Sequence, residues 1–167
     1  SGLTHFAGIV VAPRRKTPTI RQIEFLSLSE KRILLIIVTT DGDVQNRILF
    51  TERSYSPSEL TTAANYLNQF FAGHNFDQMR QRVKEDLQQL RSDLQDLMAA
   101  VLAASDDALT QTSNQYVISG QRNLLEVEEL SSNMKRLREL FDLFEQRTSL
   151  MQLLDSSHKA EGIQIFI

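Results

Sequence analysis

The sequence predicts an α+β fold in which antiparallel strands and a covering helix are followed by a long helical segment and a return to strand. Over the first fifty residues, apolar side chains alternate or form short β-branched runs. From Ser56 onward their spacing changes to three and four, which is typical of helices. The last six residues, Gly162–Ile167, read GIQIFI and predict a final strand. At 167 residues, the chain forms one domain or two small interleaved units.

Four segments near the N-terminus predict strands. The segment Phe6–Ala12 (FAGIVVA) stops at Pro13, and Ile20–Leu28 (IRQIEFLSL) shifts its alternation near its end, which predicts a bulge or a strand end there. Glu30-Lys31 makes the next turn. The six successive apolar residues Ile33–Val38 suit a strand that is covered on both faces. The fourth strand begins after Asp41-Gly42.

The Asp41-Gly42 pair predicts a two-residue type I′ hairpin turn, because that turn needs positive φ at both central residues. Counting outward then pairs Val38 with Gln45, Ile37 with Asn46 and Leu35 with Ile48. Alternation along the second strand places one amide among apolar residues on a single face: Val44, Asn46, Ile48 and Phe50. Either a loop or edge backbone satisfies the Asn46 amide, or this residue fixes a neighbouring loop or lines a pocket. The residues alone leave both readings open.

A helix begins at Ser56, where three signals agree. Ser56 is an N-cap residue, Pro57 suits the first helical position, and Glu59 can complete a capping box. Gly73 ends this helix, and Gly73–Asn75 is the best domain boundary in the chain. The apolar side of the helix consists of Leu60, Ala63, Ala64, Leu67, Phe70 and Phe71.

The next helix, predicted from Phe76 to Ala104, is polar except for a narrow apolar seam. Its seam residues follow one another at intervals of 4, 3, 4, 3 and 4: Val83, Leu87, Leu90, Leu94, Leu97 and Val101. This seven-residue repeat is typical of a helix that packs at a shallow angle along one partner helix. The partner is a second helix of the same chain, a second chain, or both.

Beyond the seam helix, Gln115–Gly120 predicts a short strand, and Ser131–Leu154 predicts an amphipathic helix. This helix is the natural companion of the seam helix. Its apolar side consists of Met134, Leu137, Leu140, Phe141, Phe144, Leu150 and Leu154.

The composition excludes several function classes. The chain has no cysteine, which removes thiolate catalysis and cysteine-ligated metals and fits a reducing compartment. Its three histidines are far apart, no catalytic or phosphate-binding motif occurs, and no apolar run approaches the length of a membrane span. The basic cluster at 14–16 is too short for a nucleic-acid surface, and the net charge is −3. We therefore expect no enzyme activity, no cofactor and no metal.

Four stretches, taken in order, resemble the heat-inducible transcription repressor family (HrcA) of bacteria. Leu3–Pro13 resembles the segment that follows the winged-helix DNA-binding domain of that family. The strands from Arg21 to Arg47 resemble the next ones, including the V-x-N-R element at Val44, Asn46 and Arg47. The G-x-x-N-L/M-L element falls on Gly120, Asn123, Leu124 and Leu125, and Gly162–Ile167 resembles a later strand.

The resemblance implies a GAF-like α+β domain, here residues 1–72 plus 160–167, interrupted by a helical dimerisation domain at 73–159. It implies a cytoplasmic homodimer that represses chaperone operons by binding an inverted-repeat operator through a winged helix absent from this sequence, with a chaperonin as a further partner. Asn46 is then a structural residue at the junction of the sheet and its neighbouring elements, not a ligand contact. A GAF-type small-molecule sensor is the alternative, and a helical scaffold without a regulatory role is the third.

Overall fold

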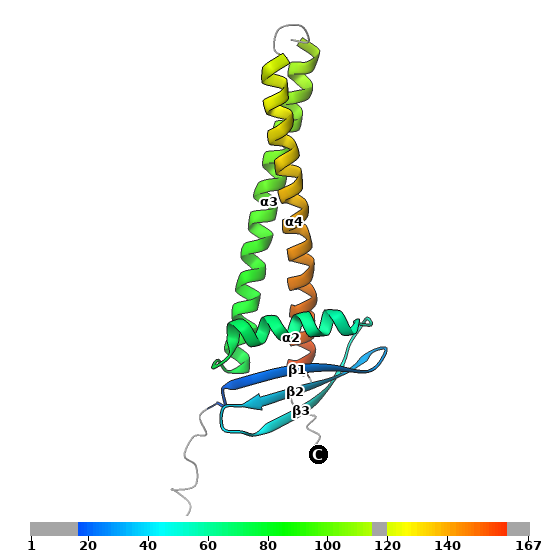
Figure 1. Ribbon diagram of the computed structural model, residues 1–167, viewed down its shortest axis with the longest axis vertical. Coiled ribbons are helices and arrows are strands. Elements are labelled where there is room, and N and C mark those ends of the chain that lie inside the picture. The colour runs from blue at the N-terminus through cyan, green and yellow to red at the C-terminus, as the bar shows by residue number, and fades with distance from the viewer. Residues whose placement is uncertain (1–16, 115–119, 160–167) are drawn as a thin grey trace, which may run out of the picture. The chain divides into compact units, whose positions relative to one another are not determined.

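The computed structural model describes residues 17–114 and 120–159, and these form an α+β fold. Strands β1 (Ile20–Ser29), β2 (Arg32–Thr39) and β3 (Val44–Phe50) come first. Helices α2 (Pro57–Phe71), α3 (Phe76–Asn114) and α4 (Gly120–Lys159) follow, as Figure 1 shows. The predicted α+β class is confirmed. The strands expected at 6–12 and 162–167 lie outside the described residues.

The chain divides into two compact units. The sheet unit contains the described residues up to Arg80 together with those from Leu153 onward, and the helical unit is Gln81–Gln152. Helices α3 and α4 each belong to both units, since each is one continuous helix. The domain boundaries expected from the family resemblance, 1–72 plus 160–167 and 73–159, remain a prediction.

The three strands form an antiparallel sheet in the order β1-β2-β3. The pairing of β1 with β2 is irregular between Ser27 and Ser29, which confirms the bulge or strand end expected there. The β2–β3 pairing differs from the predicted one by one residue: Val38 pairs with Val44, Ile37 with Gln45, Ile36 with Asn46 and Leu35 with Arg47.

The predicted two-residue turn is wrong for a backbone reason. Only Gly42 has a positive φ, +88°, whereas a type I′ turn needs positive φ at both central residues. The Gly42 amide donates to the Thr39 carbonyl at 3.0 Å, and the Thr39 amide donates to the Asp43 carbonyl at 2.9 Å. The loop therefore has three residues and ends with a glycine. The extra loop residue shifts the register by one, so Arg47 lies opposite Leu35.

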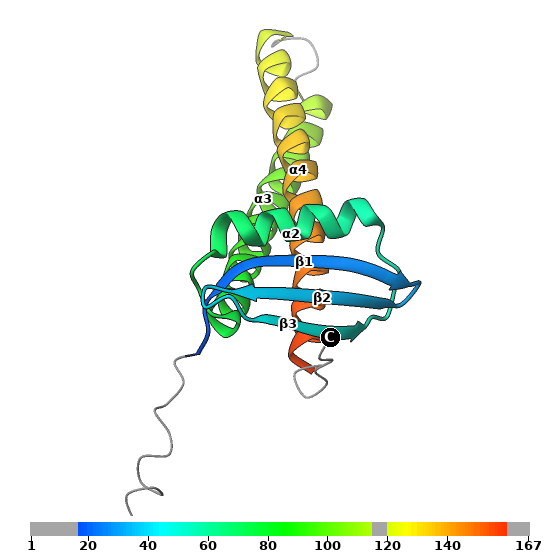
Figure 2. The same cartoon turned by 60° about the horizontal axis from the view of Figure 1, so that its bottom comes forward.

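The sheet has one buried face and one partly exposed face. Helix α2 lies along β1 on the buried face, as Figure 2 shows. The core of the sheet unit contains six side chains from the buried face of the sheet: Ile23, Phe25, Ile33, Leu35, Ile37 and Leu49. The helices add five more: Leu60, Leu67, Met79, Leu153 and Leu154. Apolar side chains on the other face, among them Val44 and Phe50, remain exposed.

The outer edge of β1 is closed by α2 and by the residues that follow it. The Asn68 side chain accepts a hydrogen bond from the Ile23 amide at 2.7 Å and donates one to the Ile23 carbonyl at 2.9 Å. The Ile20 amide donates to the His74 carbonyl, and the Gly73 amide donates to the Ile20 carbonyl. The Asn68 side chain thus makes the two hydrogen bonds that a neighbouring strand would otherwise make with the Ile23 backbone.

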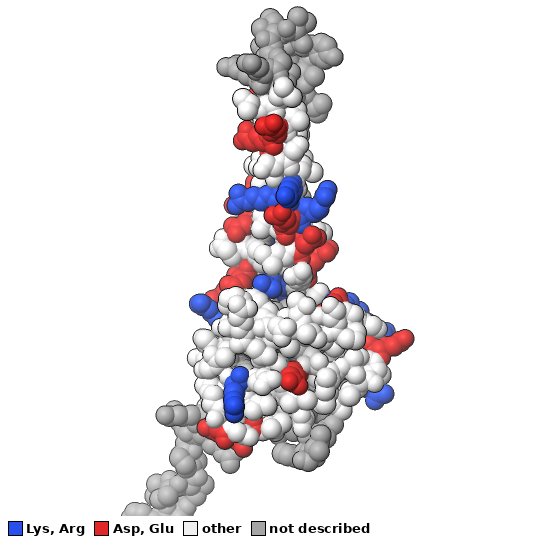
Figure 3. Space-filling model, in the orientation of Figure 1, with Lys and Arg blue, Asp and Glu red and all other residues white. Residues whose placement is uncertain are grey.

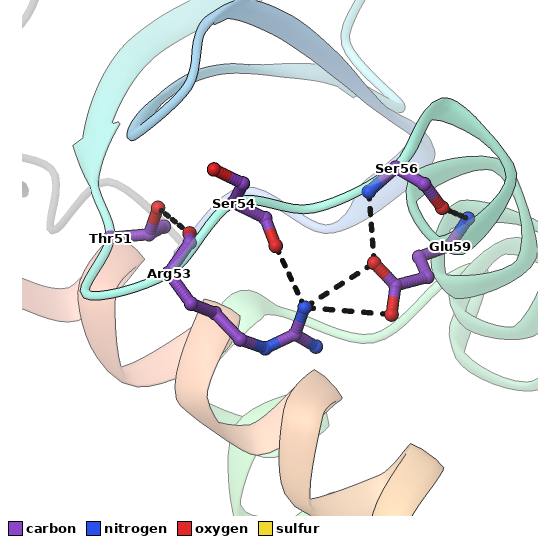
Figure 4. Close-up of polar contacts among 5 residues, drawn as sticks. All are labelled: Thr51, Arg53, Ser54, Ser56 and Glu59. Atoms are coloured by element: carbon purple, nitrogen blue, oxygen red, sulfur yellow. Dashed lines mark hydrogen bonds and ion pairs between the residues drawn. The ribbon is translucent and has the colours of Figure 1, made fainter.

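Helix α2 begins with the predicted capping box. The Ser56 hydroxyl accepts from the Glu59 amide at 3.1 Å, and the Ser56 amide donates to the Glu59 carboxylate at 2.8 Å (Figure 4). The Arg53 guanidinium forms an ion pair with the same carboxylate at 3.3 Å. These contacts hold the pKa of Glu59 below its ordinary value of 4.5, and the hydrogen bond from the Ser56 amide has the largest effect. The segment before α2 is thereby fixed at the end of β3.

Both long helices extend beyond the predicted limits. Helix α3 continues past Ala104 to Asn114, and α4 starts at Gly120, well before Ser131. Residues 115–119 of the predicted Gln115–Gly120 strand lie outside the described residues, but Gly120 is helical, so the strand assignment is wrong at that residue. Gln121–Leu130 contains mostly good helix formers, which explains the earlier start.

We expect Asn68→Ala to lower the free energy of unfolding by about 1–3 kcal/mol, because two backbone groups of Ile23 lose their partner. Urea denaturation monitored by circular dichroism measures the change. Asn65→Ala, on the exposed side of the same helix, is the matched control. Equal stability of the two variants would contradict a role for Asn68 in closing the strand edge.

The Glu59 charge should stabilise the fold fully above the ordinary pKa of glutamate and progressively less below it. A carboxyl whose pKa is lower in the folded state contributes stability that disappears as the pH falls through that folded value. Glu59→Gln should therefore lower the melting temperature at pH 7, and the difference from the parent should narrow below pH 4.5. Glu30→Gln, in the exposed β1–β2 turn, is the control. A difference that stays constant with pH would assign the effect to packing.

Candidate functional site

The seam of α3 is the first candidate, and its residues are buried to different degrees. Val83, Leu94 and Val101 are at most 7% exposed, whereas Leu87, Leu90 and Leu97 are half-buried. Helix α4 runs antiparallel beside α3 in both ribbon views (Figures 1 and 2). Within the helical unit, the burial of Leu94 and Val101 thus occurs in a single chain.

Helix α4 carries a matching seven-residue repeat. Half-buried or buried positions recur on it at alternating intervals of three and four: Leu130, Asn133, Leu137, Leu140, Phe144, Arg147 and Met151. Toward its C-terminal end the buried side broadens to include Leu143, Thr148, Ser149 and Leu150. Both helices therefore carry a seven-residue repeat, which is the pattern of helices that pack along one another.

A second apolar stripe lies outside the seam. Its six members are each 45–66% exposed: Met98 and Leu102 on α3, and Leu124, Val127, Met134 and Phe141 on α4. Met98, Leu102, Met134 and Phe141 each come one position after a seam position of their own helix, and Leu124 and Val127 do so when the α4 repeat is continued back to positions 126 and 123. On α4, Val127, Met134 and Phe141 are spaced by seven. We call this set the outer stripe.

The outer-stripe residues lie on one side of the helical hairpin. Two antiparallel helices with the same repeat are related by a two-fold axis normal to the plane that contains them. That axis maps the front of one helix onto the front of the other, so equivalent repeat positions lie on the same side. The helical unit therefore has a face on which large apolar side chains from both helices are exposed.

Charged side chains are distributed differently over the two units. In Figure 3, Lys and Arg alternate with Asp and Glu along much of the visible side of the helical unit. The visible surface of the sheet unit carries few charges.

A monomeric protein rarely exposes a continuous apolar surface, so the outer stripe is the strongest indication of a binding surface in the described helices.

The V-x-N-R residues of β3 point to opposite faces of the sheet. Asn46 is half-buried on the partly exposed face, opposite Ile36. Arg47 is 6% exposed on the buried face. Its Nη1 donates to the Ser157 carbonyl of α4 at 3.5 Å, and its guanidinium lies 5.2 Å from the centre of the Phe76 ring of α3. Within the sheet unit, Arg47 thus connects β3 with both long helices.

The inward position of Arg47 was missed in the sequence because the hairpin register was counted incorrectly. Gly42 was the residue that could have indicated the correct register. Its position at the end of a three-residue loop determines which β3 residues face the core. The contribution of Asn68 to the β1 edge had no comparable signal, since its partner, Ile23, is remote in the sequence.

The second family element lies at the start of α4. Gly120 and Asn123 fall in the first helical turn, and the Leu124 and Leu125 side chains are exposed. These residues belong to the helical unit, whereas Asn46 and Arg47 belong to the sheet unit. Leu124 joins the outer stripe, and Leu125 lies on another side of α4.

Two kinds of feature are absent from the part of the chain that the structure describes. That part contains no group of three or more His, Cys, Asp or Glu side chains that could hold a metal ion. None of its helices is long and apolar enough to span a membrane.

Comparison with known proteins identifies the family. The model of the HrcA protein C-terminal domain matches residues 1–167. The heat-inducible transcription repressor HrcA of Methylobacillus flagellatus is 56% identical over all 167 residues, which make up 49% of its own length. The chain therefore spans about half of this curated relative. No solved structure matches the chain. The whole-chain match and this identity show that the chain belongs to the HrcA family of heat-inducible transcription repressors.

Proposed function

We propose that this chain is the regulatory and dimerisation part of a repressor that acts as a homodimer on an inverted-repeat operator. The observation that carries the proposal is the outer stripe of exposed apolar side chains on the helical unit. A second copy is the occupant that matches it best, because a two-fold axis buries the same stripe on both molecules. The four helices of two hairpins then form a bundle with a continuous core.

Membership of the repressor family suggests why two copies of the chain would pair. The relative from Methylobacillus flagellatus is a heat-inducible repressor, and an inverted repeat requires a two-fold protein. In the longer protein, pairing of the helical units holds two DNA-binding domains together. We propose repression of chaperone operons in the cytoplasm, with a chaperonin as a further partner, as the resemblance to the family implies.

The seam and the outer stripe have separate tasks in this proposal. The seam residues Leu94 and Val101, already buried within one chain, hold α3 against α4. The outer stripe pairs the two chains. This division accommodates both readings of the seven-residue repeat: the seam serves the intramolecular hairpin, and another face of the hairpin serves the proposed dimer.

Charged substitutions on the outer stripe should separate the dimer without unfolding it. We expect the parent chain to sediment at twice its 19.1 kDa mass at micromolar concentration. Phe141→Glu and Met134→Glu place a charge in the proposed interface and should shift the mass to that of one chain. Ser132→Glu, at an exposed position outside the stripe, is the matched control. A monomeric parent, or stripe variants that remain dimeric, would contradict the proposal.

A charge in the seam should have a different effect. Leu94→Asp places an unpaired carboxylate where only 7% of the side chain is exposed, so it should lower the helical circular dichroism signal and the melting temperature. Phe141→Glu should leave the helical signal unchanged while it lowers the mass. The same response in both variants would show that seam and stripe do not have separate tasks.

The link to DNA is tested in the longer protein with its DNA-binding domain. Phe141→Glu should weaken binding to an inverted-repeat operator by at least about tenfold, because each half-site is then bound independently. Binding to a single half-site should not change. Undiminished binding to the complete operator would separate the dimer surface from repression.

A further inference from the structure

Two charged residues of opposite sign lie beside the outer stripe on α4. Glu128 directly follows the stripe residue Val127. Lys135 directly follows the stripe residue Met134. Both charged side chains are exposed, and because they are seven residues apart they lie on the same side of α4. The helix therefore carries a negative and a positive charge along one edge of the stripe, about 10 Å apart along its axis.

The two charges are placed almost symmetrically about the middle of the stripe. On α4 the stripe runs from Leu124 to Phe141. The point midway between Glu128 and Lys135 lies within about one residue, or 1.5 Å, of the middle of that range. A two-fold axis at right angles to α4 at this level relates positions at equal distances on either side of it. It therefore places Lys135 of one copy at the level of Glu128 of the other copy.

Two arrangements of paired hairpins bury the stripe, and they bring different charges together. In antiparallel hairpins, α4 packs on α4 of the other copy, because a two-fold axis at right angles to the helices leaves each helix on its own side. Lys135 of each copy then meets Glu128 of the other. In parallel hairpins, α4 packs on α3 of the other copy, where the corresponding positions beside the stripe, Ser92 and Ala99, carry no charge. Charge complementarity therefore favours the antiparallel arrangement.

We propose that the two helical hairpins of the dimer pair antiparallel through their outer stripes, with Lys135 of each copy in an ion pair with Glu128 of the other. This inference rests on the proposed dimer and assigns its orientation. The apolar side chains of the stripe supply the affinity, since an exposed ion pair contributes little by itself. The two ion pairs select the orientation, as charges beside an apolar seam do in coiled coils.

Distances between spin labels measure the orientation. The chain has no cysteine, so a single introduced cysteine is labelled specifically. Ser132→Cys lies near the proposed axis, and Gln146→Cys lies two repeats away on the same exposed side of α4. In the antiparallel dimer, the two labels at position 146 are separated by about 40 Å along the helix axis, and those at position 132 by almost none. Double electron–electron resonance should therefore give a clearly longer distance for Gln146→Cys. Equal distances would show parallel hairpins and overturn the proposal.

Charge reversal tests the ion pairs themselves. Lys135→Glu places two carboxylates together at both sites and should weaken the dimer about tenfold in sedimentation at low salt. Adding Glu128→Lys exchanges the two charges and should restore the affinity of the parent. Arg136→Glu makes the same change in net charge on another side of α4, and should weaken the dimer less than about twofold. Equal effects of Lys135→Glu and Arg136→Glu, or no restoration in the double variant, would overturn the proposal.

These outcomes distinguish the orientation from the dimer itself. A parent chain that sediments as a monomer would contradict both. A parent dimer with equal label distances, or one that does not respond to charge reversal at position 135, would retain the dimer and contradict only the antiparallel pairing.

Discussion

The register of the β2–β3 hairpin is the constraint on which the sheet unit depends. Gly42 adopts a positive φ at the end of a three-residue loop, and this determines which side chains of β3 face the helices. A slip of one residue would move every side chain of β3 to the opposite face. In the observed register, Arg47 and Leu49 point into the unit, and Asn46 and Ile48 point away. The inward position of Arg47 and its contacts with Phe76 at the start of α3 and Ser157 near the end of α4 follow from this single loop.

Patterns that are local in the sequence predicted most of the fold. The capping box of α2, the turn after β1 and the seam of α3 depend on residues within a few turns of each other, and all are present. The register failed because two-residue and three-residue loops that contain Asp-Gly look alike in sequence, although their backbone angles differ. The strand assigned at Gly120 failed because a short β-branched run resembles a strand whether or not a helix follows it.

The candidate site was predictable only in part. The seam was visible as a repeat and Ser131–Leu154 was expected as its companion, but the sequence left open whether the seam packs on a helix of the same chain, on a second chain, or on both. The outer stripe is recognisable only once both helices are placed, because Met98 and Met134 are far apart in the chain. The contacts of Arg47 join β3 to Phe76 and Ser157, which are remote in the sequence, so neither periodicity nor spacing could indicate them.

The side-chain amide at position 68 has a consequence for how copies of the chain meet. An open strand edge exposes a row of donors and acceptors that another molecule can extend into a growing sheet. At Ile23 those groups are already occupied within the molecule. When two sheet units come close together, the β1 edge at Ile23 therefore cannot pair with a strand of the other molecule. This protects the protein from fibre formation through that part of β1.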